Sequence, residues 1–299
     1  MKVYSNFKPD DSIETEPIVT SIGGFDGIHL GHQALFEKAF IESKGTFQIV
    51  TFNQIPKIYF NKTLDPLLDQ NQRTEIFEKL NPKNIIFLDF DSVNSMSAED
   101  FCILLKDNLK TKKLVIGKDF RFGNKRVGDV NTLMDFFGEE NVILLDDFLI
   151  KSEKVSTTKI RLFYSRGDVK SAQDYLGRKI SYKGTVIQGK KLGSTIGVPT
   201  ANVKLAENVQ LPRFGVYAVN VNCDKESYLG CLNIGLNPTV ESDNSIKIEI
   251  HILNFNKDIY DQKISFELLD FIRDEAKFES VEALKLQISQ DIEKIKNNF

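Results

Sequence analysis

In the first half of the chain, short apolar runs alternate with segments in which apolar residues recur every three or four positions. The short runs are rich in β-branched residues and bounded by Gly, Pro or Asn, which is typical of buried strands, whereas the longer spacing predicts amphipathic helices. We expect strands at Ile18–Ile22, Thr46–Phe52, Asn84–Phe90, Leu114–Ile116 and Asn141–Leu145, and helices from about Gly31, over Gln70–Leu80 and after Ser97. Strands that alternate with helices imply a parallel sheet with right-handed crossovers.

The pattern changes after Gly177, where a helix expected over about Thr158–Leu176 ends. Turns rather than helices then separate five expected strands, Ile180–Gln188, Gly215–Cys223, Tyr228–Ile234, Ile246–Leu253 and Lys263–Leu269. Such a run of strands predicts an antiparallel barrel. An apolar stripe over Ser280–Asn297 predicts a terminal helix that packs on it. We therefore predict an α/β domain at residues 1–177 and a β domain at 178–299.

Composition agrees with two domains, because 299 residues with 41% hydrophobic content can form two cores. The net charge of −3 provides no overall positive field for nucleic acid or an anionic membrane. We expect small-molecule partners and a monomer or weak homo-oligomer. No apolar run reaches the roughly 18 residues of a membrane span, and the N-terminal residues do not resemble a signal peptide. These features predict a cytoplasmic protein.

The three cysteines, Cys102, Cys223 and Cys231, are odd in number and lack C-x-x-C spacing. All three lie in segments with an apolar pattern, which favours reduced, buried thiols. We assign them no chemistry.

The first expected strand ends in a glycine-rich turn that leads into the first helix, with Gly23, Gly24, Gly27 and Gly31 close together. Glycines let the backbone approach a ligand, and a helix N-terminus offers free N–H groups and the positive end of its dipole. The turn is therefore expected to bind an anion, most naturally a phosphate.

Two of the three histidines, His29 and His32, lie in this turn. Nucleotidyl transfer requires donors where negative charge develops on the α-phosphate and the departing pyrophosphate, and imidazoles can supply them. Two alternatives stay open at this point. The pair is weakly compatible with a metal site, although metalloprotease histidines are spaced by four residues, and it is also compatible with simple helix capping.

Two further segments of the first half are basic and rich in glycine or hydroxyl groups. The stretch Lys118–Asp129 predicts a mobile basic loop, or else a solvated hairpin tip. Three hydroxyl residues precede cations at the start of the Thr158 helix, an arrangement suited to a triphosphate. The candidates there are Ser156, Thr157, Thr158 and Arg161.

The second half contains a glycine-rich segment, Gly189–Asn202, that does not fit the Walker A spacing. It predicts either a phosphate cradle or a glycine-rich surface loop. Thr200 and Asn202 offer hard oxygen ligands for Mg²⁺. The candidate nucleotide-binding residues are Gly189, Lys190, Gly193, Gly197, Pro199, Thr200 and Asn202.

The segment Ile246–Ile252 alternates strictly between isoleucine and polar residues. Its isoleucines are expected to face a core while Lys247, Glu249 and His251 share the opposite face. On the pattern alone, that polar face is a solvated sheet surface or part of a site.

The first-half motifs together resemble the bifunctional riboflavin kinase/FAD synthetases. The turn G-F-D-G-I-H-L-G-H is similar to their adenylyltransferase signature, R-F-G-N-K-R-V-G-D to their nucleotide loop, and V-S-T-T-K-I-R to their I-S-S-T-R-I-R motif. The resemblance implies a Rossmann-like nucleotidyltransferase domain, with His29 and His32 catalytic. It also implies nucleotide contacts from the loop, at Arg121, Gly123 and Arg126. Further nucleotide contacts are implied from the turn, at Gly23, Phe25, Asp26, Gly27 and Gly31.

The second-half motifs resemble the kinase domain of the same family. G-V-P-T-A-N, N-I-G-L-N-P-T, E-I-H and I-R-D-E-A-K-F are similar to its signatures. The resemblance implies a β-barrel riboflavin kinase that uses ATP and Mg²⁺, with Glu249 as the base for the riboflavin 5′-hydroxyl and Asn233 and Arg273 near the flavin. Riboflavin, FMN and FAD are then substrates or products.

The chain departs from the family pattern chiefly in its first half. Gly24 replaces a usual asparagine, Ile55 stands where a histidine is common, and Asp119 replaces a frequent asparagine. An added carboxylate repels phosphates unless Mg²⁺ or Arg121 offsets its charge. The departures keep two alternatives open: a kinase with a weak or inactive adenylyltransferase domain, and a non-catalytic flavin- or nucleotide-binding regulator.

Overall fold

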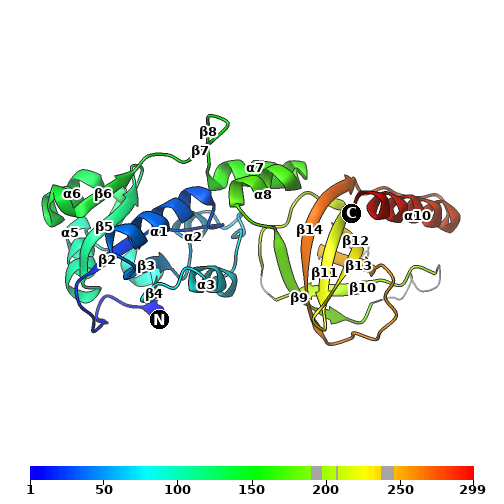
Figure 1. Ribbon diagram of the computed structural model, residues 1–299, viewed down its shortest axis with the longest axis horizontal. Coiled ribbons are helices and arrows are strands. Elements are labelled where there is room, and N and C mark those ends of the chain that lie inside the picture. Colours follow the sequence, from blue (N-terminus) through cyan, green and yellow to red (C-terminus); the bar gives the residue numbers. More distant parts are fainter. Residues whose placement is uncertain (190–196, 207, 237–245) are drawn as a thin grey trace. The chain divides into compact units, whose positions relative to one another are not determined.

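The computed structural model describes residues 1–189, 197–206, 208–236 and 246–299. The chain divides into two compact units, Met1–Thr157 and Thr158–Phe299, each of which we describe by itself (Figure 1). The predicted division into an α/β part followed by a β part is confirmed. The division into compact units falls before the helical segment that precedes Gly177, whereas our expected boundary follows it.

The first unit is built on a parallel sheet of six strands, in the order β1-β4-β3-β2-β5-β6. The strands are β1 Lys2–Phe7, β2 Ile18–Ile22, β3 Phe47–Phe52, β4 Asn84–Leu88, β5 Thr111–Gly117 and β6 Val142–Leu145. The helices of four or more residues are α1 Leu30–Glu42, α2 Pro56–Phe60, α3 Gln70–Glu78, α4 Phe90–Val93, α5 Ala98–Ile103, continued by a π-helical turn Leu104–Asn108, and α6 Val130–Phe137. A short hairpin of β7 Leu149–Ile150 and β8 Glu153–Lys154 follows.

Both faces of this sheet are covered, which explains why its central strands read as continuous apolar runs. Successive residues of β3 belong to different cores: Ile49 packs with α1 and α3, and Val50 packs with α5 and α6. All five residues of β2 are buried. The strand that leads to the candidate phosphate turn therefore lies at the centre of a three-layer unit.

A row of buried polar side chains crosses four neighbouring strands inside this apolar sheet. The Thr20 and Thr111 hydroxyls are 2.9 Å apart, the Gln48 amide donates to the Thr20 hydroxyl at 2.9 Å, and the Asn84 amide donates to Gln48 Oε1 at 3.1 Å. Gln48 also donates to the Leu109 carbonyl at 2.8 Å. Because each polar group has a hydrogen-bond partner, burying the row has only a small cost in free energy. The row explains why a polar residue interrupts the apolar pattern of four strands.

The strand order places the glycine-rich turn at the switch point of the sheet. From β2 the chain builds outward through β3 and β4 on one side, and β5 and β6 are added on the other. Ligands of open α/β sheets bind at the carboxyl ends of strands at such a point. The turn that follows Ile22 occupies that position.

Sequence reasoning missed β1 and misplaced one helix boundary. In β1 the exposed residues outnumber the buried ones, as is common for an edge strand, so its apolar pattern is weak. The single helix expected over Thr158–Leu176 is wrong. It is two helices, α7 Thr157–Arg166 and α8 Val169–Leu176, because Gly167 has a φ of 70° and Asp168 caps the second helix.

The second unit contains the predicted antiparallel barrel, closed in the order β10-β13-β12-β11-β14-β9. Its strands are β9 Ser181–Ile187, β10 Ala201–Leu205, β11 Gly215–Cys223, β12 Glu226–Leu236, β13 Ile246–Ile252 and β14 Lys263–Arg273. Strand β10 was not predicted, because Pro199 and the glycines before it indicated a loop.

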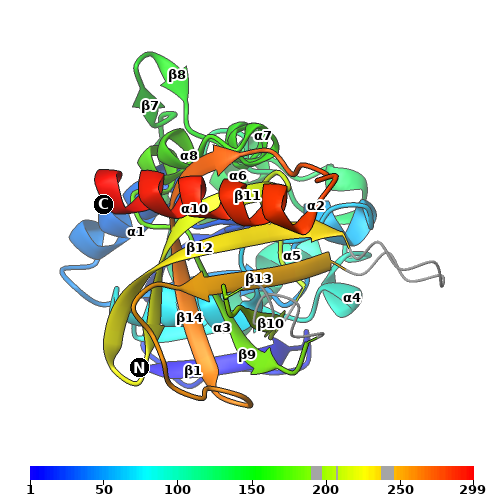
Figure 2. The ribbon, with the colours of Figure 1, turned by 90° about the vertical axis from the view of Figure 1, so that its right-hand side faces the viewer.

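The terminal helix α10 Val281–Asn298 lies across the barrel beside β12, as Figure 2 shows. Ile295 joins a cluster with Val216 and Ala218 of the barrel. The Arg273 guanidinium at the end of β14 donates to the buried Asp291 carboxylate of α10, with Nη2 2.9 Å from Oδ2. The prediction that this helix packs on the barrel is confirmed. Within the described residues, no helix is both long and apolar enough to cross a lipid bilayer.

Candidate active sites

The turn after β2 has an unusual backbone in which three residues adopt positive φ. These are Phe25 at 47°, Gly27 at 78° and Ile28 at 43°. Phe25 and Ile28 are nevertheless buried in the core below the turn, which holds the strained backbone in place. A Cβ on Gly23 would come within 2.7 Å of the Phe25 ring, so this position requires glycine. The turn is therefore rigidly attached to the sheet.

The structure brings the two predicted histidines into direct contact. His29 is the N-cap of α1, and its Nδ1 accepts the His32 backbone N–H at 3.3 Å. The two rings stack with centroids 3.6 Å apart and an angle of 17° between planes, and the edge of Phe25 packs on His32. Because Nδ1 of His29 is an acceptor here, its neutral ring carries the proton on Nε2. The capping alternative is thus structurally true of His29.

Other predicted nucleotide residues hold this turn in position. Asp26 is buried, and its Oδ1 accepts the Leu67 backbone N–H at 2.8 Å. The Thr157 hydroxyl donates to the Asp26 carbonyl at 3.2 Å, so the hydroxyl-rich segment begins beside the turn. Thr158 and Arg161 belong to the second compact unit, where Arg161 Nη1 donates to Gln210 at 2.8 Å. Their predicted nucleotide contacts stay predictions.

The basic loop after β5 makes several contacts with the rest of its unit. Phe122 is buried and pairs with Gly128 in a β-bridge, and Arg121 forms an ion pair with Asp129 at 2.8 Å. A Cβ on Gly123 would come within 3.0 Å of the Ala98 backbone, so the loop packs closely against α5. Phe122 belongs to the core of the unit, where its ring packs beside Phe101.

In the second unit, three predicted residues lie in one row across neighbouring strands. Glu249 of β13 is opposite Asn202 of β10 and opposite Asn233 of β12. Directly opposed residues of antiparallel strands share a face and approach closely. The row therefore brings the candidate base, one candidate metal ligand and one candidate flavin residue together.

A cavity of about 700 Å³ opens over this row, between β12, β13, the segment after β14 and α10. The polar lining includes the predicted residues Thr200, Asn233, Glu249 and Arg273, while Leu284 and Ile288 of α10 contribute apolar surface. Cys231 also lines the cavity, and burial raises the pKa of its thiol to about 12. The thiol is therefore protonated near neutral pH and suits an apolar wall.

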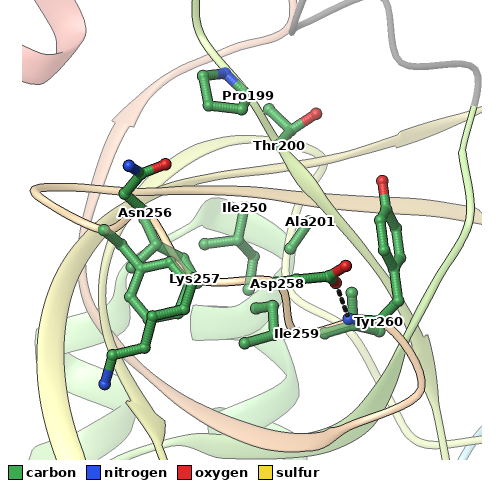
Figure 3. Close-up of a pocket in the computed structure, with 12 residues that line it drawn as sticks. Pro199, Thr200, Ala201, Ile250, Asn256, Lys257, Asp258, Ile259 and Tyr260 are labelled. Carbon is green, nitrogen blue, oxygen red and sulfur yellow. Dashed lines mark hydrogen bonds between the residues drawn. The ribbon is translucent and has the colours of Figure 1, made fainter.

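A second cavity, of about 300 Å³, lies at the mouth of the barrel (Figure 3). It is lined by Pro199, Thr200 and Ala201, by Ile250 of β13 and by the segment from Phe255 to Tyr260. The His251 ring donates from Nδ1 to the Pro199 carbonyl at 2.7 Å, which holds the Pro-Thr-Ala segment against β13. Thr200 lines both cavities and so stands between them.

Comparison with known proteins identifies a family for each half of the chain. The family model for FAD synthetase matches residues 11–159, and the model for riboflavin kinase matches residues 176–299. The bifunctional riboflavin kinase/FMN adenylyltransferase of Buchnera aphidicola from Schizaphis graminum is 36% identical over 93% of each chain. That of Listeria monocytogenes is 34% identical, over 91% of this chain and 90% of the relative. The chain belongs to the bifunctional riboflavin kinase/FMN adenylyltransferase family.

A solved structure also matches over the whole chain. The crystal structure described as a macrolide-efflux protein from Streptococcus pneumoniae superimposes with a TM-score of 0.90 at 30% sequence identity. The match covers 99% of this chain and 99% of that chain. That structure shares the fold of both units.

Two departures from the family motifs lie near each other in the structure. A Cβ on Gly24 would lie 3.6 Å from both Ile55 and Pro56, at the start of α2. The side chains at the two positions of departure would thus be neighbours, and in this chain one is absent and the other is apolar. The third departure, Asp119, is offset mainly by Lys154 of β8 at 2.5 Å, with a smaller contribution from the Arg121 charge. This hydrogen bond lowers the pKa of Asp119, so the residue stays ionised but paired.

Sequence reasoning missed Arg73, a buried cation beside the family's adenylyltransferase signature. It is 2% exposed on α3, donates to the Thr51 hydroxyl at 3.4 Å and to the Asn53 carbonyl at 3.2 Å, and lies over the Phe87 ring. Burial lowers its pKa to about 10, opposed by the nearby Asp26 carboxylate. Arg73 precedes Phe77 by four residues, so the helical spacing alone could have placed it on the buried face.

An exposed aromatic residue was also missed in this unit. Phe60, at the end of α2, is 72% exposed and packs edge-on against Tyr59 and Phe90. It belongs to the same short helix whose start contacts Gly24. An exposed ring near a phosphate turn offers a stacking surface for a flat ligand.

In the kinase unit, two glycines of the predicted cradle fall within the described residues. Gly189 packs so closely on Asn202 that a Cβ there would overlap the amide, and Gly197 has a φ of 80°. Both positions therefore require glycine. Lys190 and Gly193 lie outside the described residues, as does Asn237 of the N-I-G-L-N-P-T motif.

Proposed function

We propose that this protein phosphorylates riboflavin to FMN in its second unit and adenylylates FMN to FAD in its first, using ATP in both steps. The observation that carries the kinase assignment is the meeting of two cavities at Thr200, beside the row of Asn202, Glu249 and Asn233. One cavity is large and mostly apolar, which suits riboflavin. The smaller cavity at the barrel mouth suits the adenosine part of ATP.

In the kinase step, the riboflavin 5′-oxygen attacks the γ-phosphorus of ATP. The new bond joins that oxygen to phosphorus, the bond to the β,γ-bridging oxygen breaks, and ADP leaves. Glu249 accepts the hydroxyl proton, which requires only a carboxylate within hydrogen-bond reach. Asn233 and Arg273 contact the flavin, and the Arg273–Asp291 ion pair keeps α10 as the cavity wall.

Mg²⁺ is proposed at Thr200 and Asn202. A hydroxyl and an amide oxygen fit a hard cation, and Mg²⁺ commonly takes one or two protein ligands together with substrate phosphates and water. Among the described residues, no group of three or more His, Cys, Asp or Glu side chains is suited to a metal, which agrees with a cation held mainly by the nucleotide. When bound, Mg²⁺ would offset phosphate charge during transfer.

In the adenylylation step, a phosphate oxygen of FMN attacks the α-phosphorus of ATP. The bond to the α,β-bridging oxygen breaks and pyrophosphate leaves. His29 and His32 donate hydrogen bonds where charge develops, while the backbone N–H groups of the turn and the start of α1 bind phosphate. The proposed nucleotide contacts come from the turn, from Arg121, Gly123 and Arg126 of the loop, and from Ser156, Thr157, Thr158 and Arg161.

Small molecules are the proposed partners, without nucleic acid or membrane, in a cytoplasmic monomer or weak homo-oligomer. Light scattering of the purified chain would measure the oligomeric state.

The test is a time course with purified protein, riboflavin, ATP and Mg²⁺, in which FMN and FAD are resolved chromatographically. FMN should appear first and FAD later, and FMN supplied alone with ATP should yield FAD and pyrophosphate. Formation of FMN without FAD at any Mg²⁺ concentration would mean that the first unit is an inactive adenylyltransferase. Binding of flavin without either product would mean that the protein is a regulator.

A further inference from the structure

Lys247 forms an ion pair with the proposed base of the kinase. Its Nζ is 2.8 Å from Oε2 of Glu249, and the two side chains are 31% and 22% exposed. They are separated by one residue on β13, so both project from the same face of the strand. Both line the 700 Å³ cavity. The pair is therefore in the proposed site and not on open surface.

The other charged groups of the described cavity lining show why a cation is needed there. Arg273 is already engaged by the buried Asp291. Glu275 extends its carboxylate over Gly235, where a Cβ would overlap it, and Gly235 is the cross-strand partner of Lys247. Lys247 thus lies between the positions of two carboxylates, Glu249 and Glu275. All three line the wall of the cavity that the negatively charged ATP would approach.

A carboxylate in this position has two liabilities. It is repelled by Glu275 and by the ATP phosphates, and its side chain has several accessible rotamers. An ammonium group in contact with Oε2 reduces the repulsion and restrains that oxygen, leaving Oε1 to accept the proton of the substrate. With Oε2 restrained by Lys247, Oε1 of Glu249 is oriented toward the substrate, as a general base requires.

We infer that Lys247 is a positioning residue for the kinase step, which acts by holding the Glu249 carboxylate in its reactive orientation rather than by binding ATP. The inference rests on the proposed function, because it takes Glu249 as the base. A lysine that instead contacts the γ-phosphate directly would act independently of Glu249.

The experiment compares Lys247→Met, which keeps the length of the side chain without its charge, with Lys247→Arg in the full chain. Lys247→Met should lower kcat for FMN formation about tenfold or more, while KM for riboflavin and for ATP changes by less than about threefold. Lys247→Arg should recover most of kcat. The matched control is Lys263→Met, on an exposed residue at the start of β14 that lines neither cavity. Thermal unfolding of the same variants, followed by far-UV circular dichroism, checks that the barrel is folded, because FAD formation would report only on the first unit.

A double-mutant cycle with Glu249→Gln decides how Lys247 acts. If Lys247 works through Glu249, Lys247→Met should change FMN formation by less than about threefold in the Glu249→Gln background, although it costs about tenfold in the wild type. Equal losses in both backgrounds, or a rise in KM for ATP as the main effect, would overturn the inference in favour of direct phosphate binding. Full kinase activity of Lys247→Met would overturn it as well.

These outcomes are distinguishable from failure of the proposed function. A wild-type chain that makes no FMN contradicts the kinase assignment, and a fully active Glu249→Gln variant contradicts the choice of base. Only the comparison between the two backgrounds addresses Lys247.

Discussion

The two histidines of the turn have a structural and a proposed chemical role that substitution can separate. His29 caps α1 through Nδ1, and its ring stacks on His32. Removing a cap costs about 1 kcal/mol, so a loss of activity after His29→Ala has two explanations. Asparagine is itself a good N-cap but carries no imidazole, which makes His29→Asn the informative variant.

We predict that His29→Asn and His32→Gln each lower FAD formation from FMN by about 10²-fold, the usual scale for removing a donor to developing charge. FMN formation by the same protein should stay within about twofold, since the kinase residues lie in the other unit. The measurement is the rate of each product under saturating ATP. Near-normal FAD formation by His29→Asn would leave His29 with a capping role only.

Arg73 gives a second prediction at the residue scale. Its guanidinium links the end of β3 to the surroundings of Asp26, which in turn holds the turn through Leu67. Arg73→Met keeps most of the volume but removes the charge and both hydrogen bonds. We expect FAD formation to fall about tenfold or more through misplacement of the turn, with FMN formation unchanged.

The control for this variant is Lys79→Met, at the exposed end of α3. A matching loss in Lys79→Met would point to general damage to the helix. An Arg73→Met variant with a normal rate of FAD formation would show that the buried cation serves stability alone.

At the scale of elements, the buried polar row depends on Gln48, which contacts Thr20, Leu109 and Asn84. Gln48→Leu removes these hydrogen bonds from the buried Leu109 carbonyl and Asn84 amide, whereas the Thr20 hydroxyl keeps its bond to Thr111. We predict a loss of about 1–3 kcal/mol in the free energy of unfolding of the first unit, measured by denaturant titration followed through loss of FAD formation. Asn71→Leu, the same kind of change at an exposed position of α3, should have little effect.

The helices and strands that were predicted correctly are those in which a single effect, burial of one face, sets the order of apolar and polar residues. Alternation in Ile246–Ile252 reflects a strand with a core on one side: Ile248, Ile250 and Ile252 are buried as expected, whereas Ile246 at the start of the strand is 50% exposed. The failures occur where two causes compete. Gly167 looked tolerable inside a helix, yet its positive φ ends α7, and Pro199 suggested a loop although β10 begins two residues later.

Residues of the candidate sites could be grouped from the sequence only where they lie a few positions apart in the chain. The pair His29 and His32 is local, and so is the same-face pair Lys247 and Glu249. The row that joins Asn202 to Glu249 and Asn233 depends on barrel register, which no local pattern specifies. Arg73 was missed because its partners Thr51 and Asn53 come from another element.

At the scale of the whole molecule, the question is where the kinase unit begins. The expected boundary after Gly177 removes α7 and α8, but both helices contribute to the second compact unit. Arg213 donates its backbone N–H to the Tyr164 carbonyl at 2.8 Å, and the Gln173 amide donates to the Leu268 carbonyl of β14 at 2.7 Å. Tyr175 and Leu176 are buried as well.

We therefore predict that a fragment of residues 158–299 makes FMN at nearly the rate of the full chain, and that a fragment of residues 178–299 is active but unfolds more readily. Burying an aromatic or aliphatic side chain contributes about 1.5–3 kcal/mol, so losing Tyr175 and Leu176 should lower the unfolding midpoint clearly. The two fragments are compared by thermal unfolding and by FMN formation at several temperatures. Equal midpoints would mean that the barrel and α10 are self-sufficient and that α8 only connects the units. If neither fragment made FMN while the full chain did, the kinase reaction would require residues of the first unit, and the two activities would not be separable.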